Sequence, residues 1–162
     1  MQHRVMPIAW DELASGAAVC PMDRPRSENN EFVHFVRKLS ASSLYLDRNQ
    51  AYRGHCVLIY DLGHATRVDQ LSPEQWLASA RDLQAAAAAV FSAVQPDHMN
   101  VESLGNVMPH LHWHIIPRFK GDGRWGAPIW TTTLEEMPRK ELDAHEYLAL
   151  ASKINEAIED RV

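Results

Sequence analysis

Three histidines alternate with bulky apolar residues in the segment 109–118, and this segment constrains the fold more than any other. Side chains of a β-strand point alternately to its two faces. His110, His112 and His114 are therefore predicted to share one face, while the apolar residues between them share the other. The apolar face can enter a core, which leaves three imidazoles in a row along a polar groove.

Three interpretations of these imidazoles fit the pattern. The first is a solvent-facing polar surface, although no lysine, glutamate or threonine takes any of the three places. The second is a metal site, because neutral imidazole is the commonest metal ligand. The third is nucleophilic and acid–base chemistry, in which one imidazole attacks, another orients it and a third stabilises an oxyanion. The spacing alone does not separate the metal site from the nucleophile.

The other hydrophobic patterns predict four further strands and two helices. Ser72 is a predicted N-cap, with Pro73 in the first helical position and Gln75 three residues after the cap. A stripe of apolar residues at helical spacing follows and ends before Pro96. The predicted strands cover residues 31–39, 42–47, 54–60 and 98–104, and the predicted C-terminal helix covers residues 139–160.

Composition excludes several classes of protein. The chain has 162 residues, enough for one domain with a hydrophobic core, and a net charge of −5, which argues against general nucleic-acid binding. Its two cysteines cannot make a disulfide framework, so we expect a cytoplasmic protein. No apolar run reaches the ~20 residues of a membrane-spanning helix. The N-terminus lacks the apolar segment of a signal peptide.

The segment HLHWHII at residues 110–116 resembles the signature of the histidine triad (HIT) family, in which three histidines alternate with apolar residues. The resemblance extends to several other motifs in the same order, over roughly residues 42–118, about half of the chain. These motifs are GHCVLIY at residues 54–60, GH at 63–64, LSPE at 71–74, GN at 105–106 and PR at 117–118.

This resemblance implies an α+β fold with an HIT-like antiparallel sheet of about five strands. The helix that follows Ser72 is expected to pack on one face of the sheet and the triad to lie on the other, and a C-terminal helix completes the fold. One domain is expected to span residues 1–162, with a core at about 31–118 and a C-terminal extension at 119–162. HIT proteins are commonly two-fold dimers, so a homodimer is also expected.

HIT proteins are nucleotidyl hydrolases or transferases that act at the α-phosphate of a nucleotide. The resemblance makes His112 the nucleophile, which forms a nucleotidyl-histidine, and His114 the residue that binds the phosphate oxygens. His110 would orient the nucleophile or hydrogen-bond the backbone, and His55 would brace the triad. Two alternatives remain open: a nucleotide-binding regulator with little catalysis, and a metal-dependent hydrolase that uses the three histidines as ligands.

Three polar residues are candidates for contacts to the nucleotide. Asp47 lies eight residues before His55, the spacing at which HIT proteins place the residue that contacts the ribose hydroxyls. A carboxylate can accept hydrogen bonds from both hydroxyls of a diol. Asn100 best matches the family residue on the leaving side of the phosphate, and Asn106 is a second candidate nearer the triad. The expected partner is a small nucleotide, with no nucleic acid and no membrane.

The HIT family divides by substrate. Galactose-1-phosphate uridylyltransferases carry glutamine in place of the third triad histidine, so His114 argues against that branch. The PR motif at 117–118 and the long C-terminal segment favour a dinucleoside polyphosphate, such as diadenosine tetraphosphate, over a nucleoside phosphoramidate. The covalent step requires no cofactor, although Mg²⁺ can accompany a polyphosphate substrate.

Some HIT proteins hold a structural zinc ion with a Cys-x-x-Cys pair near the N-terminus. This chain has Cys20 and Asp23 at that spacing, and thiolate is the better zinc ligand. We therefore expect no metal, with Cys20 as a small buried residue and His64 in a structural role.

The segment 119–130 combines glycine, charged residues and tryptophan. Such a segment is typical of a loop with exposed aromatic surface. It can stack on a base, cover the groove or anchor itself to the body of the protein, and the sequence leaves these roles open.

Overall fold

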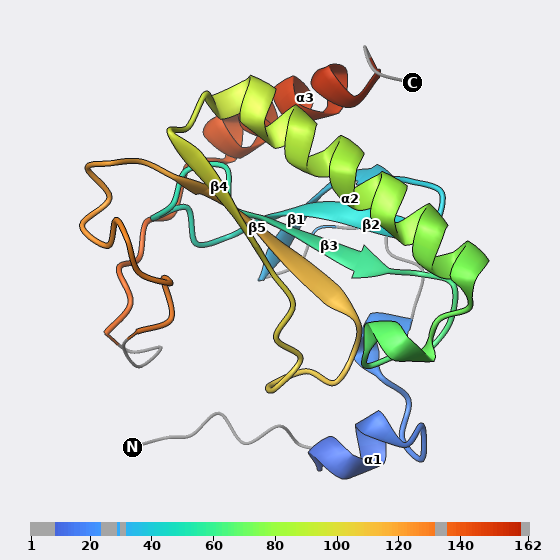
Figure 1. Ribbon diagram of the computed structural model, residues 1–162. Helices are drawn as coiled ribbons and strands as arrows, with labels where there is room; N and C mark the ends of the chain where they lie inside the picture. The colour runs from blue at the N-terminus through green and yellow to red at the C-terminus, as the bar shows by residue number, and fades with distance from the viewer. Residues whose placement is uncertain (1–8, 24–28, 30–31, 132–135, 160–162) are drawn as a thin grey trace.

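The chain folds around one antiparallel sheet and two long helices (Figure 1). The computed structural model describes residues 9–23, 29, 32–131 and 136–159. None of the helices in this part of the chain has the length and hydropathy needed to cross a bilayer. The elements are, in chain order, α1 (Trp10–Ala14), the 3-10 helix η1 (Pro21–Asp23), β1 (Val33–Lys38), β2 (Ser42–Asp47), β3 (Cys56–Tyr60), the 3-10 helix η2 (Val68–Gln70), α2 (Pro73–Val94), β4 (His98–Glu102), β5 (His112–Arg118) and α3 (Ala144–Glu159).

The five strands form one sheet in the order β1-β2-β3-β5-β4, and every neighbouring pair is antiparallel. β3 is therefore the central strand, and β5 lies between β3 and the edge strand β4. The long helix α2 connects β3 to β4, and β5 then returns beside β4. This topology confirms the predicted α+β class with an antiparallel sheet of about five strands.

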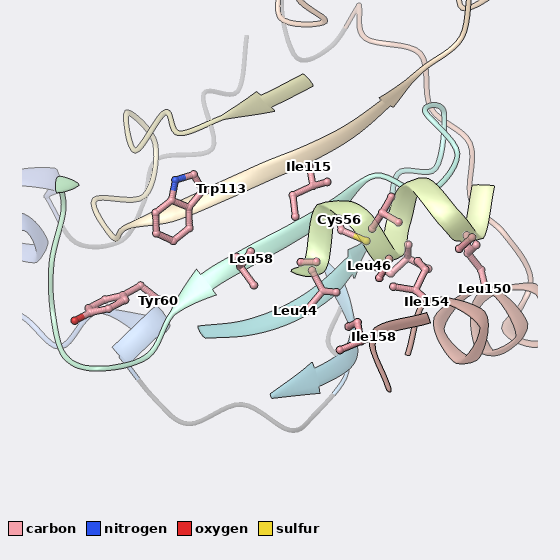
Figure 2. Packing of buried hydrophobic residues seen from close by; sticks show 14 of the residues in the cluster. Leu44, Leu46, Cys56, Leu58, Tyr60, Trp113, Ile115, Leu150, Ile154 and Ile158 are labelled. Carbon is pink, nitrogen blue, oxygen red and sulfur yellow. The ribbon is translucent and has the colours of Figure 1, made fainter. Parts of the chain in front are cut away.

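The alternation of side chains along β5 separates a helix-covered face from the triad face. Trp113 and Ile115 point toward α2 and α3 and belong to the main hydrophobic core. Figure 2 shows them near apolar side chains of β2, β3 and α3. Because successive side chains of a strand point to opposite faces, His112 and His114 point away from the helices. The helices therefore pack on one face of the sheet and these two histidines lie on the other, as predicted.

α2 begins and ends where the sequence predicts. The Ser72 hydroxyl accepts a hydrogen bond from the Gln75 N–H at 3.3 Å, and the Gln75 amide oxygen accepts one from the Ser72 N–H at 2.9 Å. Pro73 occupies the first helical position, where its missing N–H is not needed. Gln95, in the left-handed conformation with a φ of 51°, caps the other end just before Pro96.

The C-terminal helix starts later than predicted. α3 begins at Ala144 rather than near residue 139, because Asp143 and Glu146 form a reciprocal cap. Oδ1 of Asp143 accepts from the Glu146 N–H at 2.8 Å, and Oε2 of Glu146 accepts from the Asp143 N–H at 3.0 Å. The predicted end at residue 160 lies outside the described residues.

The triad strand is also shorter than predicted at its start. β5 begins at His112, because the N–H of His110 donates to the carbonyl of Met108 at 2.8 Å and closes a tight turn. His110 thus lies in a bend before the strand and takes no part in its alternation.

Candidate active site

His112 and His114 are neighbours on the triad face of β5. Their ring centroids lie 5.2 Å apart with the ring planes at 78°. His112 is buried and His114 is half-buried. Two adjacent imidazoles of this kind can divide two tasks between them, attack on a substrate atom and binding of its charged oxygens.

A backbone carbonyl determines which ring nitrogen of His112 carries the proton. Nδ1 of the ring lies 2.6 Å from the carbonyl oxygen of His110. Because a carbonyl can only accept a hydrogen bond, Nδ1 is the donor and Nε2 of the neutral ring carries the lone pair. Burial lowers the pKa of His112, and the bond to the His110 carbonyl offsets only part of that shift. The ring is therefore neutral at pH 7, with Nε2 ready to act as a nucleophile.

His55 supports His114 from the start of β3. Nε2 of His55 lies 3.1 Å from Nδ1 of His114, so one ring donates and the other accepts. Burial lowers the pKa of His55 to about 4. Burial, together with the neighbouring rings of His55 and His112, lowers the pKa of His114 to about 3. With His55 as the donor, Nε2 of His114 keeps its proton and can donate to an anionic oxygen.

The turn before β3 places His55 against the triad. Gly54 has a φ of +86°, which side-chain-bearing residues rarely adopt, and a Cβ there would lie 2.9 Å from Cγ1 of Val94. The Gly54 N–H donates to Oε1 of Gln50 at 2.8 Å, and Nε2 of Gln50 donates to the carbonyl of His55 at 3.0 Å. The buried amide side chain of Gln50 thus holds the turn that carries His55.

Trp130 covers the paired rings of His55 and His114. Its ring centroid lies 5.1 Å from that of His114 and 6.4 Å from that of His55. The indole N–H donates to the carboxylate of Glu102, which is the cross-strand neighbour of His114 in the β4–β5 pair. Trp130 also packs on a hydrophobic cluster of the body, so the last residue of the segment 119–130 both contacts the rings of the site and anchors the loop. Nothing in the sequence around Glu102 predicts its contact with Trp130.

Asp47 lies next to His55 at the end of β2. Its N–H donates to the His55 carbonyl at 3.0 Å, and Oδ1 of its carboxyl accepts from the Asn49 N–H at 2.7 Å. Burial raises the pKa of Asp47 to about 6, although the bond to Asn49 works in the opposite direction. The residue is near the triad, as a ribose contact requires, and that contact stays a prediction.

Asn100 and Asn106 lie on the β4 side of the site. Oδ1 of Asn100 accepts a hydrogen bond from Nη1 of Arg118 at 2.9 Å. Asn106 is exposed in the loop that joins β4 to β5. The structure therefore separates Asn100 from the rings by Glu102, and the nucleotide contacts of both asparagines stay predictions.

Comparison with protein families agrees with this geometry. Residues 27–121 match the HIT domain. The chain belongs to the HIT family. No curated protein matches the sequence.

Solved structures share the fold of this HIT protein. A histidine triad protein from Bradyrhizobium japonicum has a TM-score of 0.72 at 24% identity, over 83% of this chain and 97% of that chain. A protein from Sulfolobus tokodaii, described as a hypothetical histidine triad nucleotide-binding protein, has a TM-score of 0.61 at 26% identity, over 79% and 85%. A zinc-bound histidine triad family protein from Mycobacterium smegmatis has a TM-score of 0.57 at 20% identity, over 96% of both chains.

The first histidine of the HIT motif faces a different group of side chains. Nε2 of His110 lies 2.7 Å from the carbonyl of Tyr60 and must be the donor, so Nδ1 carries the lone pair. This Nδ1 lies 3.1 Å from Oδ1 of Asp23 and 3.8 Å from Sγ of Cys20. His110 therefore supports His112 with its backbone, while its side chain points toward η1.

Four potential metal ligands converge at this point of the HIT fold. The ligand atoms of Cys20, Asp23, His64 and His110 all lie within 4.8 Å of one another, and Nδ1 of His64 is 3.0 Å from Oδ1 of Asp23. A tetrahedral ion with bonds of about 2.0–2.3 Å separates its ligands by roughly 3.3–3.6 Å. Three of the six pairs of ligand atoms lie at 3.0, 3.1 and 3.8 Å, close to that range, and the others lie within 4.8 Å. The donor set of one sulfur, one oxygen and two nitrogens fits zinc.

This cluster removes the reason for expecting no metal, although the expectation itself is untested. We expected no metal because the second cysteine of the family pair is missing and because His64 was assigned a structural role. Asp23 stands at the place of that cysteine, and its carboxylate faces the lone pair of His110 Nδ1, an arrangement that a cation between the two would stabilise. The spacing Cys20-x-x-Asp23, taken together with His64, was the signal in the sequence that could have found the cluster.

Proposed function

We propose that this HIT protein is a nucleotidyl hydrolase with His112 as its nucleophile. The observation that carries the proposal is the 2.6 Å hydrogen bond from Nδ1–H of His112 to the carbonyl of His110. That bond leaves Nε2 unprotonated at neutral pH, so the ring needs no general base before it attacks. Membership of the HIT family supports the same reaction.

The reaction has two steps at the α-phosphate. Nε2 of His112 attacks phosphorus, the bond from phosphorus to the leaving group breaks, and the leaving group departs with the electron pair and takes up a proton. Nε2–H of His114 donates to a non-bridging phosphate oxygen and stabilises the charge of the transition state. Water then attacks phosphorus, the P–Nε2 bond breaks, and a nucleoside monophosphate leaves.

A dinucleoside polyphosphate is the substrate that the sequence favours. The PR motif at 117–118 and the long C-terminal segment support this branch of the family. In that case the leaving group is a nucleoside polyphosphate, which Mg²⁺ can accompany.

A nucleoside phosphoramidate is the second candidate, and one contact favours it. The carboxylate of Glu102 is the cross-strand neighbour of His114. It would repel an anionic polyphosphate and would attract an amine. The two candidates share the nucleotidyl-His112 intermediate and differ only in the group that leaves.

A zinc ion would be held by Cys20, Asp23, His64 and His110, away from the nucleophile. The similar protein from Mycobacterium smegmatis is described as zinc-bound, which supports this part of the proposal. Zinc would neutralise the thiolate and carboxylate and cross-link η1 to the bend before β5. The side chain of His110 would then hold in place the same residue whose carbonyl orients His112.

A homodimer through α2 completes the proposal. Trp76, Leu77 and Phe91 on this helix are 43%, 51% and 44% exposed, a large apolar contribution to one surface. Light scattering of the purified protein at micromolar concentration measures the mass directly. A monomer at those concentrations would contradict this part.

The decisive experiment traps the covalent intermediate. The protein is mixed with diadenosine tetraphosphate or with an adenosine phosphoramidate, quenched in denaturant at neutral pH, and digested for mass spectrometry. A nucleotidyl group on the peptide that contains His112 is expected with the better substrate. Tight nucleotide binding with negligible turnover would indicate a regulator instead, and zinc bound directly by His112 would indicate a metal-dependent hydrolase.

A further inference from the structure

The side chain of Gln50 joins the end of β2 to the residue that precedes β3. Gln50 is 1% exposed, and its amide makes three hydrogen bonds. Oε1 accepts from the Gly54 N–H at 2.8 Å, while Nε2 donates to the carbonyls of Asp47 at 2.6 Å and His55 at 3.0 Å. Both donors of the amide are therefore used, and one buried side chain closes the turn that leads into His55.

A segment near the C-terminus lies across this turn. The described residues 137–142, which we call the C-terminal strap, lie outside the helices and strands. The carbonyl of Lys140 accepts the backbone N–H of Gln50 at 2.7 Å, and the N–H of Lys140 donates to Oδ1 of Asn49 at 3.1 Å. Nδ2 of Asn49 donates to the carbonyl of Pro138 at 3.0 Å. The strap therefore holds the main chain from which the Gln50 amide extends.

Both ends of the C-terminal strap are anchored by buried apolar side chains. Met137 is buried in the same small cluster as Ile116 of β5. Leu142, at the other end, belongs to the main core between the sheet and the helices, and its N–H donates to the Tyr147 hydroxyl at 3.3 Å. The strap lies outside residues 27–121, the part of the chain that matches the HIT domain. It is thus an addition to that domain that contacts the turn before β3.

The position of His55 matters because its ring contacts that of His114. Nε2 of His55 and Nδ1 of His114 lie 3.1 Å apart. The proposed reaction needs Nε2–H of His114 to bind the phosphate oxygens, and a hydrogen bond from His55 to Nδ1 keeps that proton on Nε2. The bond is lost when either ring moves by about 1 Å. The turn that carries His55 therefore acts on the proton of His114.

We propose that Gln50 and the C-terminal strap are positioning elements of the active site, which hold His55 so that His114 presents its Nε2–H to the phosphate. The inference rests on the proposed reaction at His112 and adds two contributors that act through other residues. Gln50 suits the task because a neutral amide offers two donors and an acceptor. A glutamate there would turn a carboxylate toward two carbonyls, and a methionine would remove the acceptor of the Gly54 N–H.

The test uses Gln50→Met, which has a similar length and makes none of the three bonds, and Gln50→Glu, which keeps only the acceptor. NMR of the ¹⁵N-labelled protein identifies which ring nitrogen of His114 carries the proton, with His114→Asn to assign the signals. Kinetics with diadenosine tetraphosphate and with an adenosine phosphoramidate give kcat and KM. Gln75→Met is the matched control, because it removes the acceptor of the Ser72 N–H in the first turn of α2.

In the wild type most of the His114 rings should carry the proton on Nε2. Both Gln50 variants should contain a mixture of the two tautomers and should lower kcat by about tenfold to a hundredfold, with KM changed less than about threefold. Asn49→Ala breaks only the side-chain bonds to the strap and should lower kcat about threefold to tenfold. Gln75→Met should change stability alone. Asn155→Ala, which loses one long-range hydrogen bond to β1, is the control for Asn49→Ala.

An unchanged His114 tautomer in both Gln50 variants, or a changed tautomer without loss of kcat, would overturn the positioning role. Equal behaviour of Asn49→Ala and Asn155→Ala would remove the strap from the proposal. Asn49→Ala decides through the same two readouts where the Gln50 variants do not fold. A tautomer shift in a protein whose wild type forms no covalent intermediate would support the positioning and overturn the proposed reaction. Normal turnover through nucleotidyl-His112 in both Gln50 variants would do the reverse.

Discussion

Nδ1–H of His112 donates to the backbone carbonyl of His110 across 2.6 Å. The bond joins the proposed nucleophile to the residue whose side chain lies in the Cys20–Asp23–His64 cluster. Any shift of the bend that carries His110 would therefore change the direction in which Nε2 of His112 points. The geometry at His112 thus depends on a segment that contributes no group to the proposed reaction.

Replacing His112 with asparagine should abolish the covalent intermediate and reduce turnover at least about a thousandfold, since it removes the Nε2 lone pair that attacks phosphorus. Nucleotide binding should persist, because the phosphate and ribose contacts remain. Quenched-flow mass spectrometry and calorimetry check the two parts. His145→Asn, on the exposed surface of α3, is the control, and full turnover in His112→Asn would remove the assignment.

The acidic limb of the kcat/KM profile should lie below pH 6.5. Burial lowers the pKa of His112, so the ring loses its lone pair only when the pH falls through that lowered value. The midpoint of the acidic limb should therefore lie below the ordinary histidine value. A profile whose acidic limb is centred above 6.5 would contradict the burial argument.

Stability should also depend on pH, and two of the groups involved, His55 and Asp47, act with opposite sign. His55 has a pKa of about 4 in the folded protein, so its contribution is complete above pH 6.5 and is lost as the pH falls toward 4. The loss is up to roughly 3 kcal/mol. Asp47, with a pKa of about 6, contributes stability that is complete below its ordinary value of 3.8 and is lost as the pH rises through 6.

Urea unfolding between pH 7.5 and 4.5 separates these two effects. His55→Asn should flatten the loss of stability toward acid, and Asp47→Asn should steepen it. The same slope in both variants as in the wild type would show that neither group titrates as its burial requires.

Purified protein should carry about one zinc ion at the Cys20–Asp23–His64–His110 cluster. At a hundredfold excess of zinc over its Kd the ion adds about 2.7 kcal/mol, so a chelator should lower the Tm by about 5–10 °C. Asp23→Ala should lose the metal, and Asp23→Cys should bind it more tightly because thiolate is the better ligand. Cys56→Ala, at the other buried cysteine, should retain it, and absorption of the cobalt-substituted protein reports the thiolate ligand.

Removing the ring of Trp130 should expose the His55–His114 pair to water. In Trp130→Ala the pKa values of both histidines should rise from about 4 and about 3 toward 6.5, because less desolvation opposes their charged forms. NMR titration of the imidazole C–H signals measures this directly. Trp10→Ala on α1 is the control, and unchanged titration in Trp130→Ala would show that the indole does not exclude water from the pair.

Gly54→Ala should destabilise the fold by about 2–3 kcal/mol. The new methyl group would lie 2.9 Å from Cγ1 of Val94, on a backbone with a φ of +86°. Gly121→Ala is the matched control, since a Cβ there has no neighbour within 4 Å and its φ lies outside the left-handed region. Chemical denaturation of the two variants gives the difference, and equal midpoints would contradict the crowding around Gly54.

The sequence predicted those parts of the fold that depend on local patterns. Alternation at period two fits only an extended chain, so HLHWHII was sufficient to place His112 and His114 on the face of β5 opposite Trp113. The start of α2 followed from Ser72 and Gln75, three residues apart. The start of α3 is also set by a local pattern, the capping pair Asp143 and Glu146. The sequence prediction placed the start of this helix too early because it did not use that pair.

The candidate site was predicted in part. The spacing and the family resemblance singled out His55, His112 and His114, and the structure brings their rings together. His110 was expected in the same row, but a turn closed by the Met108 carbonyl removes it from the strand. The alternation of apolar and polar residues gives no signal for that turn.

By itself the sequence determined the strand that carries His112, the long helix behind it and the family to which the chain belongs. Only the tertiary structure decided that His64 meets Asp23 across 41 residues, that Cys20 meets His110 across 90, and that Trp130 covers the triad from a position 28 residues beyond Glu102. The physical reason is the separation along the chain of the residues that interact. Periodicity and capping act over a few residues, whereas these contacts depend on how loops without a repeating pattern pack on the sheet.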